Sequence, residues 1–294
     1  MRNPDPLRDF DAFDPALLDP MRRARKLDGR RQLTPAQRVI VLGGGLSFKQ
    51  QVLATSPALF VDASLSPLWQ NSTRTTPAAA ADDLVRVIDD LSGNANHITT
   101  PSDDARFTLK LGIQGGRQVL LADGTDDTGE SASAVSISGN AAFTIIWVIR
   151  PTGDGSERVP GGIGDAGVAL ASCFLDFDAR GAGIPSVEYA GNKPAIFVSY
   201  TADAFKVFSI VKTAGAIDTT TSFYINGVSQ AVQAGSTTDT PNITDRVFTL
   251  GSIPNAASGY FKDYIATMIL YRSALADGVR KVIENAAIKH WGIT

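Results

Sequence analysis

Short apolar segments separated by turn-forming residues recur along this chain from residue 58 onward, and they limit the possible folds more than any other feature. The segments are rich in β-branched and aromatic residues, and most are bounded by Gly, Asn, Asp or Ser. They are Ala58–Ser64, Leu84–Leu91, Gln118–Ala122, Phe143–Ile149, Ala169–Asp178, Ala195–Tyr200, Phe205–Lys212, Ser222–Ile225, Val247–Gly251 and Tyr260–Tyr271. Many short strands at fairly regular spacing predict a β-sandwich or barrel.

The pattern changes after Arg272, where apolar residues recur at helical spacing. Leu275, Val279 and Ile283 fall on one face, Ser273 can cap the first turn, and Gly292 follows the last apolar residue. The sequence therefore predicts a helix that closes the chain. Trp291 at its end and Trp147 on an apolar strand are expected to fill the core rather than to bind a sugar.

Composition excludes several classes of protein. The 294 residues are enough for one large β-domain with a single core. Because 27 basic side chains face 30 acidic ones, a nucleic-acid-binding surface across the whole chain is not expected. The single cysteine, Cys173, excludes an intramolecular disulfide and a cysteine-based zinc cluster. The acidic, Pro-rich start is unlike a signal peptide and no run has the length of a membrane span, so we expect synthesis in the cytoplasm without membrane insertion.

Residues 1–50 differ from the rest of the chain and predict an N-terminal arm, with the sandwich over residues 51–294. The arm holds ten basic and six acidic side chains, whereas the remainder holds 17 basic and 24 acidic ones, so the two parts carry opposite net charge. The arm has few large apolar residues and no core of its own. We expect it to dock on other subunits, with Phe10 and Phe13 among the contacts; the alternative is that it wraps its own domain.

A basic cluster in the arm is the main candidate for contact with a partner. It can bind phosphate, an acidic neighbouring subunit or the acidic sandwich of another copy, and a solvated helix face is an equally good interpretation. The cluster consists of Arg22, Arg23, Arg25, Lys26, Arg30 and Arg31.

Several local patterns resemble, in order, those of the laminin-G/concanavalin A-like jelly rolls found in phage virion and tail proteins. They are Leu59-Phe60-Val61-Asp62-Ala63-Ser64, Val87 to Asn94 with Asn96-His97, Gly115 to Asp127, Phe143 to Val148, Phe223 to Val228, and the segment from Phe248 to Ile293. The resemblance covers about residues 57–294 and implies two antiparallel sheets in a jelly-roll sandwich. Thr267 stands where the family often has Glu, so no role of that Glu can be transferred.

The resemblance suggests two binding sites. Laminin-G-like sandwiches often bind calcium at a rim through Asp side chains, which makes Asp123, Asp126 and Asp127 the candidate ligands, although these residues are also ordinary turn formers. Trp69, in a polar stretch after Pro67, is the candidate stacking surface for a glycan.

A catalytic site is not evident in the sequence. Hydrolases of this fold look like Glu-x-Asp-x-x-Glu, and the nearest match here is Asp176-Phe177-Asp178, which has no Glu; Glu188 lies beyond a Gly-rich turn. We interpret Asp176 as part of a solvated strand end. A Ser/His/Asp triad is hard to build, because His97 falls in a turn and His290 in the last helix.

Together these features predict a non-enzymatic phage virion protein of the tail, baseplate or capsid surface, assembled as a homo-oligomer. Its arm would dock on other virion subunits, and its sandwich would face outward and bind host-surface glycan. The alternatives are a stand-alone carbohydrate-binding module and a glycoside hydrolase on the same fold.

Overall fold

The computed structural model describes residues 46–294, apart from residues 152–155, 178–183, 192, 198–201, 233–236 and 257. The sheet elements are β1 Leu59–Asp62, β2 Leu68–Trp69, β3 Leu84–Val85, β4 Val87–Ile88, β5 Ile98–Thr99, β6 Phe107–Gln114, β7 Arg117–Asp123, β8 Gly129–Ala134, β9 Phe143–Pro151, β10 Arg158–Gly164, β11 Ser172–Phe177, β12 Pro185–Tyr189, β13 Lys193–Ile196, β14 Lys206–Lys212, β15 Thr221–Ile225, β16 Val228–Gln230, β17 Val247–Leu250 and β18 Lys262–Tyr271. The helices are α3 Phe48–Leu53, α4 Ile217–Thr220 and α5 Asp277–Trp291.

These strands form two antiparallel nine-stranded sheets, as the sequence predicts. Sheet A has the order β16-β15-β14-β9-β18-β7-β6-β3, with β1 paired to β18. Sheet B has the order β13-β12-β11-β10-β17-β8-β5-β4-β2. The large core lies between them and includes Phe107, Trp147 and Phe208, all fully buried. The jelly-roll sandwich is confirmed.

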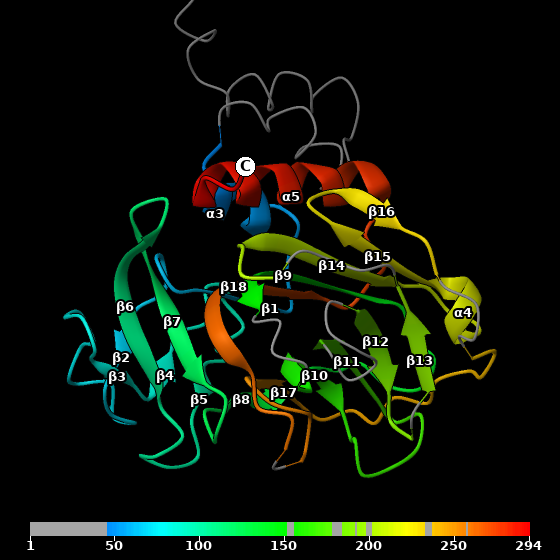
Figure 1. Ribbon diagram of the computed structural model, residues 1–294, viewed down its shortest axis with the longest axis horizontal. Coiled ribbons are helices and arrows are strands. Elements are labelled where there is room, and N and C mark those ends of the chain that lie inside the picture. The colour runs from blue at the N-terminus through cyan, green and yellow to red at the C-terminus, as the bar shows by residue number, and fades with distance from the viewer. Residues whose placement is uncertain are drawn as a thin grey trace, which may run out of the picture.

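A second apolar layer covers the side of sheet A that faces away from sheet B. The closing helix α5 and the short helix α3 lie across this side (Figure 1) and pack on Phe60, Ile146 and Ile269. Trp291 is fully buried here, and Gly292 ends the helix in the left-handed conformation, with a φ of 61°. Both features confirm the sequence-based predictions. The predicted cap at Ser273 is wrong, because α5 begins after Ala276 and no side chain caps its first turn. No helix in the described part of the chain is long and apolar enough to span a membrane.

Two other predictions need correction or confirmation. The apolar segment 84–91 is not one strand, because it crosses from sheet A to sheet B at Arg86: β3 pairs with β6, and β4 pairs with β2 and β5. The tight turn at Asn226-Gly227, which joins β15 to β16, is confirmed, with φ values of 49° and 82° at the two residues.

The predicted docking arm lies almost entirely outside the described residues. Its basic cluster and Phe10 and Phe13 also lie outside them, so the role of the arm stays a prediction.

Candidate functional site

The outer face of sheet B, on the side away from sheet A, carries a row of side chains that crosses all nine strands. Inner-face residues such as Leu68, Ile98 and Leu250 belong to the core, so their direct neighbours along each strand point outward. Strand register aligns one outward residue from each strand with the next. This transverse row consists of Trp69, Val87, Thr99, Glu130, Thr249, Gly162, Phe174, Glu188 and Pro194.

The row is open at its Trp69 end and covered at its Glu188 end. Trp69 is half-buried and Glu130 is exposed. By contrast, Phe174 is only 4% exposed, because Ile253 packs on it from the loop after β17. Within the open end, Val87 and Thr249 are buried, at 2% and 3% exposed. The accessible positions are Trp69, Thr99 and Glu130, and three strand spacings separate the first from the last, which gives an open path of about 14 Å along the sheet. The predicted candidate Trp69 therefore lies at one end of an elongated polar surface.

A cavity of about 280 Å³ adjoins the open path at Glu130. Arg246 lines it and forms an ion pair with Asp165, with 2.6 Å between Nη2 and Oδ2. Asn255 also lines the cavity and donates from Nδ2 to Asp165 Oδ1 at 2.9 Å. This hydrogen bond, followed by those from the Gly167 backbone and Arg246, lowers the pKa of Asp165. The cavity thus has rigidly held donors beside the Glu130 carboxylate.

Two buried carboxylates lie on adjacent strands at the covered end. Asp176 pairs with Ser186, and Phe174 pairs with Glu188, so Asp176 and Glu188 are diagonal neighbours on one face. Diagonal neighbours in such a pair lie roughly 7–8 Å apart, which falls within the range of about 6.5–9.5 Å between the two carboxyl groups of inverting glycoside hydrolases. Asp176 is 1% exposed and Glu188 is 5% exposed. The interpretation of Asp176 as a solvated strand end is therefore wrong.

Two buried hydroxyl groups lie near this carboxylate pair. The hydroxyl groups of Ser172 and Ser186 are buried on the same outer face, and neither has a hydrogen-bond partner among the residues that the structure describes. Such groups are costly to bury unless they bond to water or a ligand. Asp178, the second carboxylate of the sequence motif, lies outside the described residues.

The predicted calcium ligands do converge. One carboxylate oxygen from each of Asp123, Asp126 and Asp127 lies within 4.8 Å of the others. Burial, and then the charges of Asp123 and Asp126, raise the pKa of Asp127 to about 7, against the effect of a hydrogen bond from the Asp123 amide. Oxygen donors of this kind suit calcium. Asp123 Oδ1 also accepts from the Thr125 amide at 2.7 Å, which is the turn-forming role. Calcium binding here stays a prediction.

A Ser, a His and an Asp do meet elsewhere, contrary to the sequence-based expectation, but in an order that does not suit acyl transfer. Ser64 Oγ donates to Asp62 Oδ1 at 2.7 Å and lies 3.1 Å from His290 Nε2. The hydroxyl therefore lies between the two other groups, whereas a triad needs the imidazole between them. Burial, and then Arg117, lower the pKa of His290 to about 4.

Thr267 completes this cluster on the inner side. Its hydroxyl donates to Asp62 Oδ2 at 2.6 Å and accepts from Trp291 Nε1 at 2.8 Å. These bonds tie β1, β18 and α5 together, so we assign the cluster to fold stability.

Comparison with solved structures identifies the fold. No family model and no curated protein matches the sequence. An arabinofuranosidase complexed with arabinofuranosyl-α-1,2-xylobiose matches with a TM-score of 0.59 and 13% identity, over 84% of this chain and 65% of that one. A GH54 α-L-arabinofuranosidase soaked with a cyclic sulfate inhibitor matches with a TM-score of 0.58 and 14% identity, over 84% and 66%. The binding domain of botulinum neurotoxin serotype D matches with a TM-score of 0.54 and 12% identity, over 84% and 56%.

These matches place the protein among the jelly-roll-like β-sandwiches, a fold shared by glycosidases and binding domains. The chain spans less than two thirds of the length of each of these structures. The prediction of a non-enzymatic protein is contradicted, because the matched structures include glycosidases. The carboxylate pair was missed because it depends on the pairing of β11 with β12, which no local sequence pattern encodes.

Proposed function

We propose that the outer face of sheet B binds an extended glycan along the open part of the transverse row. The observation that carries this proposal is the alignment of Trp69, Thr99 and Glu130 on one open path that leads to the cavity beside Glu130. An aromatic ring offers a flat apolar surface for a sugar ring, and hydroxyl and carboxylate groups bond its hydroxyls. The carbohydrate-bound arabinofuranosidase among the matched structures is consistent with this role.

Replacing Trp69 by alanine tests the proposal. Loss of the indole surface is expected to weaken glycan binding about tenfold or more, since such aromatic contacts contribute roughly 1–2 kcal/mol. Binding would be measured by calorimetry on glycans first selected with an array. Tyr264→Ala is the matched control, because Tyr264 is also a half-buried aromatic residue but lies on sheet A. Equal affinities of wild type and Trp69→Ala would contradict the assignment of this face.

A second candidate function is hydrolysis of the bound glycan. It is favoured by the diagonal pair Asp176 and Glu188, whose expected separation suits the general acid and general base of an inverting hydrolase. The pair lies on the same face of sheet B as the glycan path, at the covered end of the transverse row.

We also propose that the protein is a phage virion subunit that presents this face outward, toward host-surface glycan. Support comes from the jelly-roll resemblance and from the opposite net charges of residues 1–50 and 51–294. On this proposal the arm docks on other virion subunits and promotes homo-oligomers.

Neutralising the arm tests the docking proposal. Replacing Arg22, Arg23, Arg25 and Lys26 by alanine in the full chain is expected to shift defined oligomers toward monomer, because attraction to the acidic sandwich is lost. Light scattering at low and high salt would show the shift. Monomers for both proteins, or unchanged oligomers, would contradict docking through this cluster.

A further inference from the structure

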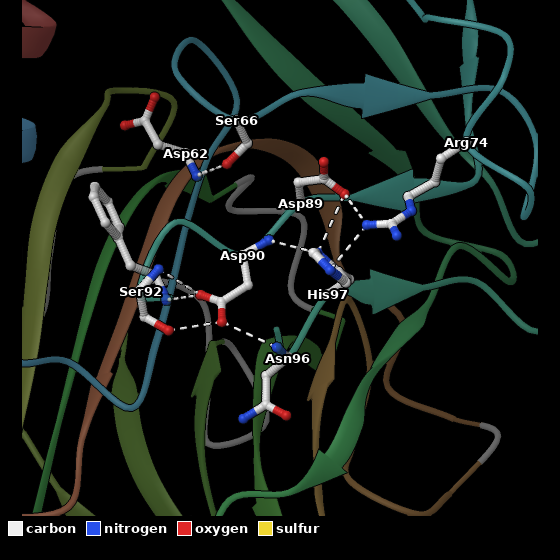
Figure 2. A network of polar contacts seen from close by, with 9 residues as sticks. Asp62, Ser66, Arg74, Asp89, Asp90, Ser92, Asn96 and His97 are labelled. Carbon is white, nitrogen blue, oxygen red and sulfur yellow. Dashed lines mark hydrogen bonds and ion pairs between the residues drawn. The ribbon is translucent and has the colours of Figure 1, made fainter. Parts of the chain in front are cut away.

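Three charged or titratable side chains meet beside Trp69, at the open end of the transverse row. Figure 2 shows Arg74, Asp89 and His97 converging there. Asp89 follows β4, and His97 precedes β5; the register of these strands places the two residues opposite each other on the outer face. Trp69 pairs with Val87, two residues before Asp89, so the indole is a diagonal neighbour of this cluster.

The loop that carries Arg74 is held firmly by its own hydrogen bonds. Asn71 Oδ1 accepts from the Thr75 amide at 3.0 Å and from the Thr76 amide at 3.3 Å. Its Nδ2 donates to Thr75 Oγ1 at 2.8 Å. Arg74 itself has a φ of 54°, an uncommon conformation for a residue with a side chain. The position of Arg74 relative to Trp69 is therefore fixed by the loop.

Neighbouring groups hold Arg74 and His97 in the cluster. Arg74 Nη1 donates to Asp89 Oδ1 at 3.3 Å and lies 2.9 Å from His97 Nε2. His97 Nδ1 accepts from the Asp90 amide at 3.1 Å and lies 3.2 Å from Asp89 Oδ1. All these contacts of Arg74 use the Nη1 group. Its Nε and Nη2 groups have no partner among the residues that the structure describes, and the side chain is 44% exposed.

A guanidinium held by one nitrogen, with its other edge available, suits a planar anion. The Nε and Nη2 groups can donate two parallel hydrogen bonds to one carboxylate. Because His97 and Asp89 already hold Nη1, little conformational entropy is lost when that edge binds. The adjacent indole can stack on the sugar ring that carries the carboxylate.

We propose that the Trp69 end of the face binds a carboxylate-bearing sugar residue, with Arg74 as the bidentate partner of its carboxylate. This inference rests on the proposed glycan-binding function and adds the chemical class of one sugar. Glu130, further along the path, is an exposed carboxylate and disfavours a second acidic sugar beside it. The ligand is therefore a mixed glycan with an acidic residue at this end, rather than a uniformly acidic chain.

Chemical reduction of the glycan carboxylates to alcohols provides the matched probe. Wild-type protein would be titrated with a panel of capsular polysaccharides that combine neutral and carboxylated sugars, each beside its carboxyl-reduced form. We expect Arg74→Ala to weaken binding of at least one carboxylated glycan by 10-fold to 100-fold, and to leave the reduced form of that glycan unaffected. Arg74→Lys keeps the positive charge but cannot donate two parallel hydrogen bonds to one carboxylate, so its affinity should lie between those of Arg74→Ala and the wild type.

Lys110→Ala is the control. Lys110 is also a cation that pairs with an aspartate, Asp82, but it lies on β6 of sheet A, away from this face. Thermal melting of each variant separates a loss of affinity from a loss of fold. Equal weakening of the carboxylated and reduced forms by Arg74→Ala would overturn the inference, as would a wild type that prefers the reduced form. In both cases, weaker binding by Trp69→Ala would leave the glycan-binding function standing. Failure of the wild type to bind any glycan would instead remove the proposed function, and this inference with it.

Discussion

Replacing Asp90 by alanine is expected to lower the free energy of unfolding by about 3–5 kcal/mol. The carboxylate of Asp90 is the centre of a buried network (Figure 2) and accepts hydrogen bonds from the amides of Phe60, Ser92 and Asn96 at 2.9–3.0 Å. Ser92 Oγ donates a fourth bond, at 2.7 Å. Hydrogen bonds to a charged acceptor contribute about 1.5–3 kcal/mol each, and a buried amide left without a partner costs about 1–3 kcal/mol.

The effect is expected to be large because the network joins distant parts of the chain. β1 pairs with β18 along one edge, and its other edge is held at Phe60 by Asp90 and by the Leu91 amide, which donates to the Phe60 carbonyl at 2.7 Å. Without the Asp90 carboxylate, Phe60 keeps only one of these two hydrogen bonds, the one from the Leu91 amide.

Urea unfolding would measure the change. Asp90→Asn keeps one oxygen acceptor and should cost less than alanine, whereas Asp104→Ala removes an exposed carboxylate and should cost less than 1 kcal/mol. If Asp90→Ala were no more destabilising than Asp104→Ala, the turn would not depend on this carboxylate.

The same turn shows what the sequence can predict. Asp90, Ser92 and Gly93 indicate a turn by residue type alone, because these side chains bond local backbone. Runs of β-branched and aromatic residues likewise predicted β9 and β18, and helical spacing predicted α5. Each of these patterns is local, so no knowledge of the partner strand is needed.

Pairing between distant strands could not be predicted in the same way. β10 was missed because it is Gly-rich, and β12 begins with a proline, so neither has the usual composition of a strand. The alignment of Trp69 with Glu130 and Glu188 depends on seven consecutive strand registers. A shift of one residue in any strand would move its side chain to the other face. The candidate site is therefore a property of the assembled sheet.

Conservative replacement of the carboxylate pair should have the largest effect on any glycosidase activity. We expect Glu188→Gln and Asp176→Asn each to lower the hydrolysis rate by about 10²–10⁴-fold, because an amide can neither transfer the proton nor act as the base. Both changes preserve shape. Glycan binding by the open Trp69 end should be unaffected, since Glu188 lies seven strand spacings from Trp69.

Glu130→Gln is the internal control for this experiment. Glu130 lies on the same row but four strand spacings from Glu188, about 19 Å along the sheet, so the two cannot act on one glycosidic bond. Rates would be measured as release of reducing ends from glycans already shown to bind. Loss of turnover in Glu130→Gln, with retention in Glu188→Gln and Asp176→Asn, would move the reaction to the open end. Absence of turnover of every bound glycan by the wild type would overturn the catalytic assignment of the pair. Loss of turnover in Glu188→Gln and Asp176→Asn alone would place bond cleavage at the covered end of the row. A glycan bound at the open end would then have to pass beneath Ile253, which packs on Phe174 between the two ends.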